Sequence, residues 1–224
     1  IFMKINILTI FPDFFHSIID CSMLKKAQER GAVEIQIVNI RDYAFDKHHL
    51  TDEPPFGGGA GMVMKIEPID LALQALGVKK GQAHSCILLT SAKGSLYTQK
   101  KAQEYSQFEK VTLICGHYQG VDERVAENLV DDELRVGDYV LTGGESATVV
   151  ILDSIVRLIP GVLGNSESLL NESHQEDGLF GAPVYTRPAV YRQWKVPPVL
   201  LSGDHLQIDE WRTQKRELIS SSKT

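Results

Sequence analysis

The alternation of hydrophobic and polar residues at the start of the chain predicts a strand, a helix and a second strand. Residues 4–10 (KINILTI) alternate loosely, as a strand does. Residues 12–29 carry apolar side chains at helical spacing, and Gly31 follows as a stop signal. Residues 33–40 predict the second strand. This β-α-β order favours a parallel sheet with right-handed crossovers.

Similar patterns of strands and helices continue along the chain, with segments between them that predict neither. We expect strands at 85–90 and 110–115, a strand or a strand-like turn at 133–141, and helices at 67–76, 95–107, 122–128, 144–159 and 205–219. Residues 46–61 form a long loop that contains two prolines and four glycines. Residues 162–187 show no strong element, which predicts either a functional lid or a disordered segment. The prolines of Val196–Val199 predict a linker.

Composition and charge narrow the class of protein. Apolar residues make up 43% of the chain and charged residues 23%, as in soluble globular proteins. No apolar run approaches the roughly 20 residues that span a bilayer, and the apolar start lacks the flanks of a signal peptide. The three cysteines are widely spaced, so we expect neither a disulfide framework nor a zinc site, and we expect a reducing cytoplasm. The net charge of −6 argues against a broad nucleic-acid-coating face, but it allows a local basic patch that reads one folded RNA.

Turns that follow three predicted strands share a composition typical of a ligand site. They are Leu89–Gly94 (LTSAKG), Gly116–Gly120 (GHYQG) and Val136–Gly144 (VGDYVLTGG). Ligands gather at the carboxyl ends of parallel strands, so backbone amides and carbonyls at these turns could hold an adenosine. The alternative is that the tyrosines of these turns are half-buried core residues. The first turn, Leu8–Phe14, lacks the glycines of a dinucleotide fold, which argues against a nicotinamide-dependent oxidoreductase.

A glycine-rich segment, Gly57–Gly61, follows Pro54–Phe56 in the long loop. Glycines let a backbone lie close against a ligand. The charged, hydrogen-bonding and aromatic residues around them suit an unstacked base and its phosphates. A flexible surface loop is the alternative.

Carboxylates gather in the segment 165–187, downstream of an isolated arginine. They are Glu167, Glu172, Glu176 and Asp177. Arg157 lies on a mostly apolar predicted helix, where an arginine usually has a carboxylate or an anionic ligand as its partner. The alternative for the carboxylates is a solvated acidic loop.

Taken together, these motifs resemble the bacterial tRNA (guanine-37-N1)-methyltransferases of the knotted SPOUT class. The resemblance is carried by Arg41–Met64, Cys115–Val125, Val136–Glu145, Ile159–Asn165, Pro183–Pro188 and Val196–His205. These segments occur in family order and cover nearly the whole chain. The resemblance implies an α/β fold, in which a parallel sheet carries a trefoil knot on its C-terminal side, and a small helical C-terminal domain.

The resemblance also implies domain limits and an assembly. Residues 1–161 would form the knotted domain that binds S-adenosylmethionine, 162–187 an interdomain linker or lid, and 188–224 a shortened helical domain. Two subunits would share each active site in a homodimer, and the partner would be tRNA. Mg²⁺ is a possible additional cofactor, although no metal site is predicted.

The resemblance implies cofactor and tRNA contacts at particular positions of this chain. The implied cofactor contacts are Leu89, Thr90, Ser91, Gly116, Tyr118, Gln119, Gly120, Val136, Gly137, Asp138, Tyr139, Val140, Leu141, Gly143 and Gly144. The implied tRNA contacts are His48, Asp52, Phe56, Gly57, Gly58 and Gly59. Lys47, Arg187, Arg192 and Lys195 are candidate phosphate contacts, with ordinary surface charge as the alternative.

In outline, methylation of guanine at N1 needs one carboxylate that accepts a proton and one cation that stabilises negative charge. The N1 proton must leave before the nitrogen can attack a methyl group, and a carboxylate within hydrogen-bond reach can accept it. Negative charge then builds on O6, where a fixed guanidinium stabilises it. The resemblance puts the arginine on Arg157 and the general base on Glu172.

The sequence departs from the family at several of these positions. Glu172–His174 stands where aspartate, serine and phenylalanine are common, so Glu176 and Asp177 remain rival bases. His117 and Gln119 stand where arginine and glutamate are common. These departures keep one alternative open, a non-catalytic RNA-binding protein of the same fold.

Overall fold

The computed structural model describes residues 2–163, 172–174 and 178–223. By its internal contacts the chain divides into two compact units, residues 1–164 and 165–224, and each is described by itself. The division into three parts expected from the sequence stays a prediction.

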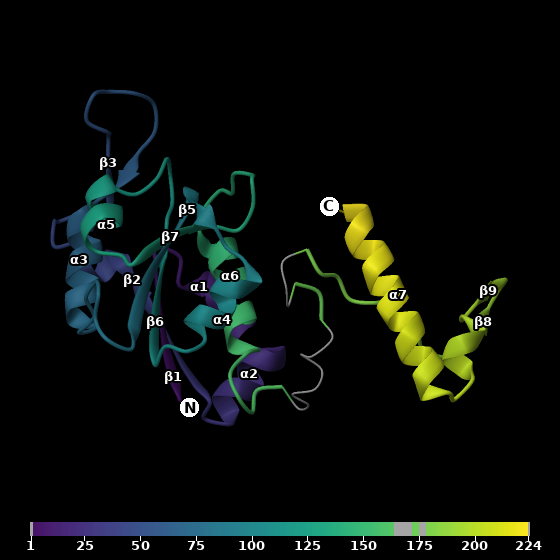
Figure 1. The fold of residues 1–224 in the computed structure, drawn as a ribbon. Helices are drawn as coiled ribbons and strands as arrows, with labels where there is room; N and C mark the ends of the chain where they lie inside the picture. Colours follow the sequence, from purple (N-terminus) through teal and green to yellow (C-terminus); the bar gives the residue numbers. More distant parts are fainter. Residues whose placement is uncertain (1, 164–171, 175–177, 224) are drawn as a thin grey trace. The chain divides into compact units, whose positions relative to one another are not determined.

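A five-stranded parallel sheet forms the centre of the first unit (Figure 1). Its strands are β1 (Met3–Thr9), β2 (Val33–Asn39), β5 (Ser85–Leu96), β6 (Lys110–Cys115) and β7 (Asp132–Arg135), in the order β2-β1-β6-β5-β7. Ile5 of β1 pairs with Ile35 on one side and with Val111 on the other. The expected α/β class with a parallel sheet is therefore confirmed.

Helices cover both faces of this sheet (Figure 1). They are α1 (Asp13–Ile19), α2 (Ser22–Glu29), α3 (Ile66–Ala75), α4 (Gln99–Tyr105), α5 (Glu123–Asn128) and α6 (Glu145–Val156). Helices α3 and α5 lie on one face, and α1, α2, α4 and α6 lie on the other. The result is a three-layer unit with a core on each side of the sheet.

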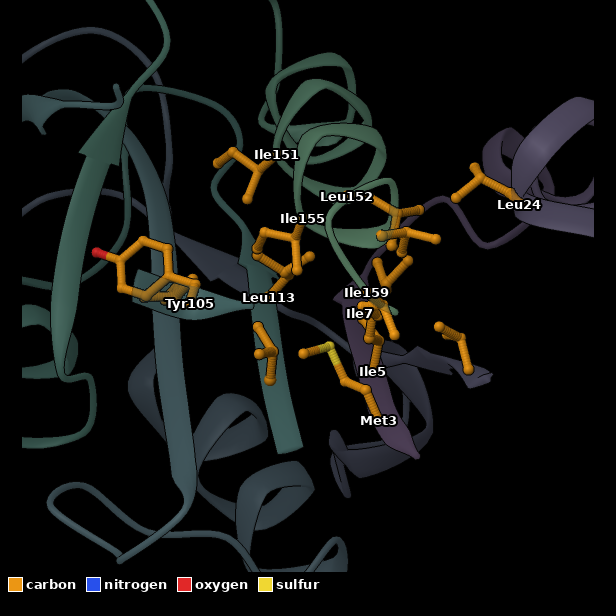
Figure 2. Packing of buried hydrophobic residues seen from close by; sticks show 14 of the residues in the cluster. Met3, Ile5, Ile7, Leu24, Tyr105, Leu113, Ile151, Leu152, Ile155 and Ile159 are labelled. Carbon is orange, nitrogen blue, oxygen red and sulfur yellow. The ribbon is translucent and has the colours of Figure 1, made fainter. Parts of the chain in front are cut away.

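Alternation along β1 supplies both cores, because successive strand residues point to opposite faces. Ile5 and Ile7 pack in the core that contains Leu152 and Ile155 of α6, as Figure 2 shows. Leu8 belongs to the core on the opposite face. A strand buried on both faces in this way is typical of parallel sheets.

Two predicted helices have different limits in the structure. The helix expected over 12–29 is two helices, and Gln28 Nε2 donates to the Ile19 carbonyl at 2.8 Å, satisfying a backbone acceptor at the break. The helix expected from Ser95 begins at Gln99 instead, because Ser95 and Leu96 extend β5. The Thr98 side chain caps the true start of that helix.

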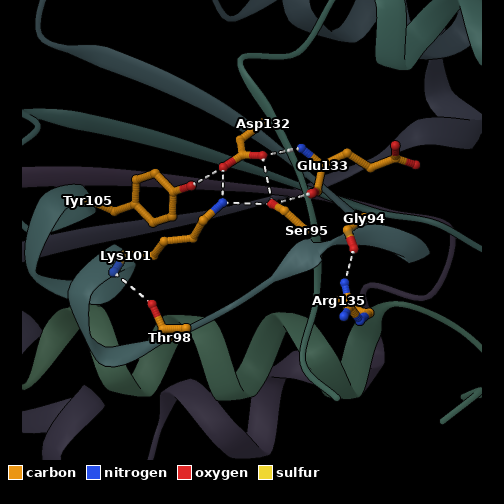
Figure 3. A network of polar contacts seen from close by, with 8 residues as sticks. All are labelled: Gly94, Ser95, Thr98, Lys101, Tyr105, Asp132, Glu133 and Arg135. Atoms are coloured by element: carbon orange, nitrogen blue, oxygen red, sulfur yellow. Dashed lines mark hydrogen bonds and ion pairs between the residues drawn. The ribbon is translucent and has the colours of Figure 1, made fainter. Parts of the chain in front are cut away.

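A polar network ties the extended end of β5 to β7 (Figure 3). Asp132 accepts hydrogen bonds from Tyr105 Oη at 2.6 Å and Ser95 Oγ at 3.2 Å, and it pairs with Lys101. Partial burial acts to raise the pKa of Asp132, but the hydrogen bonds from Lys101 and Tyr105 outweigh it and lower that pKa. Arg135 Nη1 also donates to the Gly94 carbonyl at 2.6 Å.

The three cysteines are free. Cys86 and Cys115 lie within the apolar core. Burial raises the pKa of the Cys86 thiol to about 12, and it raises the pKa of Cys115 as well. Both thiols are therefore protonated near neutral pH and chemically quiet.

The second unit contains a hairpin, a short 3-10 helix and a long helix. Strands β8 (Val190–Tyr191) and β9 (Trp194–Lys195) pair in antiparallel fashion, η3 spans Pro198–Leu201 and α7 spans His205–Lys223. The expected terminal helix is confirmed. The hairpin was not predicted, and part of the expected linker is η3. No helix in the described part of the chain is long and apolar enough to cross a membrane.

We predict that Asp132→Asn lowers the free energy of unfolding at pH 7 by about 1–3 kcal/mol, because it removes a charged acceptor from the network. A lowered folded-state pKa stabilises the fold above the ordinary aspartate pKa, and this contribution is lost as the pH falls through the folded-state value. The difference between parent and variant should therefore shrink below about pH 4. Urea unfolding at several pH values measures it.

The exposed pair of Asp138 with Arg135 provides the control. Asp138→Asn should change stability by no more than about 0.5 kcal/mol. A pH-independent difference for Asp132→Asn would contradict the role given to its charge.

Candidate active site

A cavity of about 390 Å³ lies beside residues 89–93 of β5, where β6 and β7 end. Its wall contains every expected cofactor contact except Asp138: Leu89, Thr90, Ser91, Gly116, Tyr118, Gln119, Gly120, Val136, Gly137, Tyr139, Val140, Leu141, Gly143 and Gly144. The Asp138 side chain is largely exposed and bonds to Arg135 Nε at 2.8 Å. Segments far apart in the sequence thus meet at one carboxyl edge of the sheet.

Direct hydrogen bonds hold these segments together. Gly144 N donates to the Gly116 carbonyl at 2.6 Å, and Gly116 N donates to Thr90 Oγ1 at 3.2 Å. A Cβ on Gly144 would lie 2.7 Å from Gly116 N and would overlap Thr90 Oγ1. A Cβ on Gly116 would lie 2.6 Å from the Thr90 carbonyl oxygen. Both positions therefore require glycine, because of close approach and not because of a turn.

Charged residues that the sequence did not single out also line the cavity. Lys93 pairs with Glu123, and its Nζ lies 3.9 Å from Glu133 Oε1. Lys93 lies in β5, Glu133 lies in β7 and Glu123 begins α5. Their spacing in the sequence carries no signal of this meeting, since only the strand order brings them together.

A buried carboxylate lies behind the cavity wall. Glu145, the first residue of α6, accepts a hydrogen bond from Thr9 Oγ1 at 2.9 Å, and its Oε2 lies 3.6 Å from His117 Nδ1. The start of a helix favours a negative side chain. His117 lines the cavity and contacts the rings of Phe11 and Tyr118 edge-on.

The glycine-rich loop is joined to the cavity at its base. Strands β3 (Asp52–Glu53) and β4 (Val63–Met64) pair across it, and Met64 N donates to the Gly120 carbonyl at 2.9 Å. Asp52 therefore lies at the base of the loop.

The other expected tRNA contacts of this loop lie in solvent. His48 is exposed, Phe56 is fully exposed, and Gly57, Gly58 and Gly59 have positive φ angles with open space where a Cβ would be. None of them lines the cavity. The structure therefore presents them as a separate exposed surface.

The two expected catalytic residues belong to different units. Arg157 follows the last turn of α6 and is half-buried, and Glu172 is half-buried in the second unit. Ser173 Oγ accepts a hydrogen bond from Gly181 N at 2.9 Å. The rival bases Glu176 and Asp177 lie outside the described residues, as does Glu167. Among the described residues, no group of three or more His, Cys, Asp or Glu side chains could hold a metal ion.

Comparison with known proteins identifies the family. The family model described as tRNA (Guanine-1)-methyltransferase TrmD matches residues 3–223. The chain belongs to this family. Proteins named tRNA (guanine-N(1)-)-methyltransferase from Bacillus cereus (strain AH820), Bacillus anthracis (strain A0248) and Bacillus thuringiensis subsp. konkukian (strain 97-27) are each 52% identical over 210 residues. The match covers 94% of this chain and 85% of each relative, and it confirms the resemblance found from the motifs.

We predict that Gly144→Ala lowers the free energy of unfolding by about 1–3 kcal/mol, because the added methyl overlaps the packed Thr90 and Gly116. Ser146→Ala, two residues along on an exposed position of α6, should change it by less than about 0.5 kcal/mol. Thermal or urea unfolding measures both. Equal stability of the two variants would show that the three segments are not in this close contact.

Proposed function

We propose that this protein transfers a methyl group from S-adenosylmethionine to N1 of guanine 37 in tRNA. The main support for the proposal is the lining of the cavity. It consists largely of Leu89–Ser91, Gly116–Gly120 and residues of Val136–Gly144, and the last two of these segments belong to the motifs on which the family resemblance rests. Membership of the family and the names of the relatives support the reaction. Since the substrate is tRNA, we place the reaction in the cytoplasm.

The cavity suits S-adenosylmethionine in size and chemistry. Its volume falls within the range of roughly 300–1,000 Å³ typical of small-molecule sites. Leu89, Val140 and Leu141 offer apolar surface for a flat adenine ring, while the glycine segments offer backbone donors and acceptors. Glu123 and Glu133 also line the cavity, where Lys93 and Arg135 balance their charge.

Two side chains of the protein would accept the N1 proton of guanine and stabilise the negative charge on O6. When bound, S-adenosylmethionine supplies an electrophilic methyl group. Glu172 would accept the N1 proton of guanine, which frees the ring nitrogen to act as nucleophile. The guanidinium of Arg157, which stays charged at all relevant pH values, would stabilise the negative charge on O6. Holding nucleophile and methyl group in line would supply much of the remaining rate enhancement.

A homodimer with a shared site is part of the proposal. Arg157 and Glu172 lie in different units, so a second copy could supply either one. Phe11, Phe14 and Val150 expose large apolar side chains on the first unit, as surfaces that pair with another subunit do.

We also propose the family's trefoil knot for this chain, although such knots are rare. The segment 136–144 leaves β7 beside the extended end of β5, where Leu96 pairs with Arg135. It then reaches Gly116 after β6. These two attachments support a threaded path. A need for Mg²⁺ stays a prediction, and methyl transfer with and without EDTA tests it.

Methyl transfer from labelled S-adenosylmethionine to total tRNA, with mapping of the modified nucleotide, tests the proposal directly. A label on N1 of guanine 37 supports it. Saturable S-adenosylmethionine binding without any methyl transfer would favour the non-catalytic alternative.

We predict that Glu172→Gln lowers the rate of methyl transfer by roughly 100- to 10,000-fold, because an amide cannot accept the N1 proton. Binding of S-adenosylmethionine, measured by calorimetry, should be unchanged. Glu176→Gln and Asp177→Asn are matched controls and should retain most of the activity. Normal turnover in Glu172→Gln, together with a large loss of activity in one control, would identify the residue changed in that control as the general base.

We predict that dimers of one Arg157→Ala and one Glu172→Gln subunit have about half of the parent activity if each site combines residues from two chains, since one of their two sites then holds both parent residues. Each variant alone should be nearly inactive. Subunits are mixed by co-expression, and dimers carrying both tags are purified and assayed. Absence of activity in every mixture would show that both residues act within one chain.

A further inference from the structure

The β8–β9 hairpin of the second unit exposes two aromatic rings that are not part of a buried core. Tyr191 pairs with Trp194 across the hairpin, and their ring centroids are 5.9 Å apart. Tyr191 is 56% exposed and Trp194 is 66% exposed. Every residue from 184 to 195 is exposed, so neither ring contributes to a buried core.

An arginine completes this aromatic surface. Arg192 follows β8 in the turn with a positive φ of 56°. Its guanidinium carbon lies 5.4 Å from the Tyr191 ring centroid and 5.8 Å from the Trp194 ring centroid, within the range of cation–π contacts. We call Tyr191, Arg192 and Trp194 the hairpin platform (strands β8 and β9 in Figure 1).

The charge around the hairpin platform has one sign. Residues 183–203 contain Arg187, Arg192 and Lys195 and no acidic residue, although the whole chain has a net charge of −6. A local basic patch on an acidic protein favours a polyanionic partner at that patch.

We propose that the hairpin platform stacks an unpaired base of the tRNA and that Lys195 contacts a neighbouring phosphate. This inference rests on the proposed function, which makes tRNA the partner. Unstacked RNA bases bind to aromatic rings and to the planes of arginine guanidinium groups, and both kinds of surface are present in the hairpin platform. Basic side chains near such rings hold the backbone in register without reading sequence.

Fluorescence of a single tryptophan tests the stacking directly. The chain has two tryptophans, Trp194 and Trp211, so Trp211→Phe leaves Trp194 as the only reporter. We expect saturating tRNA to lower its emission about twofold or more, because a stacked base quenches indole. Trp194→Phe, which leaves Trp211, is the control and should change little.

Three results of this experiment would overturn the inference. The first is unchanged Trp194 emission at saturating tRNA, and the second is equal quenching by a blunt, fully paired RNA duplex. The third is quenching without RNA that grows with protein concentration, which would make a second copy of the chain the occupant.

Affinity and salt dependence separate stacking from charge. Trp194→Ala should weaken tRNA binding about tenfold and leave its salt dependence unchanged, whereas Trp194→Phe should keep most of the affinity. Lys195→Ala should reduce the slope of log affinity against log salt by about 1. Equal losses in Trp194→Ala and Trp194→Phe, or a reduced slope for Trp194→Ala, would contradict stacking. Unchanged S-adenosylmethionine binding and melting temperature confirm that each variant is folded.

Methyl-transfer assays of the parent protein distinguish failure of this inference from failure of the proposed function. If the parent methylates tRNA while Trp194→Ala keeps the parent's KM for tRNA, the hairpin platform has no role in binding and the proposed function stands. If the parent transfers no methyl group to tRNA, the proposed function fails whatever the fluorescence shows.

Discussion

The close contact among Thr90, Gly116 and Gly144 is the constraint on which the rest of the structure depends. It joins the middle of β5, the turn after β6 and the start of α6 through backbone groups of the two glycines and the Thr90 hydroxyl, with no room for a Cβ at either glycine. The cavity exists because these segments meet there. The same contact fixes the first turn of α6, whose far end carries Arg157. Cavity and arginine are therefore positioned by one helix.

The Asp132 network supports this contact from the side. Strand β5 continues past the cavity to Leu96, which is unusual because the residues after a strand end normally form the ligand loop. Lys101, Tyr105 and Ser95 hold the continuation against Asp132. Gly94 lets the two backbones approach, since a Cβ there would lie 2.5 Å from the Glu133 backbone. Residues Ser91–Lys93 of β5, which line the cavity, therefore lie between two paired stretches of the same strand.

Charged side chains are distributed differently in the two units. Acidic and basic residues balance in the cavity lining of the first unit, whereas residues 183–203 of the second contain Arg187, Arg192 and Lys195 and no acidic residue. An acidic protein can thus act on RNA if its basic groups are confined to a small surface. The loop with Phe56 is another exposed surface, and it is joined to the cavity through Met64 and Gly120.

The hydrophobic pattern of the sequence determined the elements that are marked by a short buried run or by helical spacing. Strands β1 and β6 and helix α3 lie close to their predicted limits for this reason. The motifs also indicated the family, which the comparisons confirm. Tertiary structure alone decided that Ser95 belongs to a strand, since its partner β7 lies nearly forty residues away. It alone brought Lys93 to Glu123 and placed Tyr191 opposite Trp194, because strand order and short hairpins leave no periodic trace in a sequence.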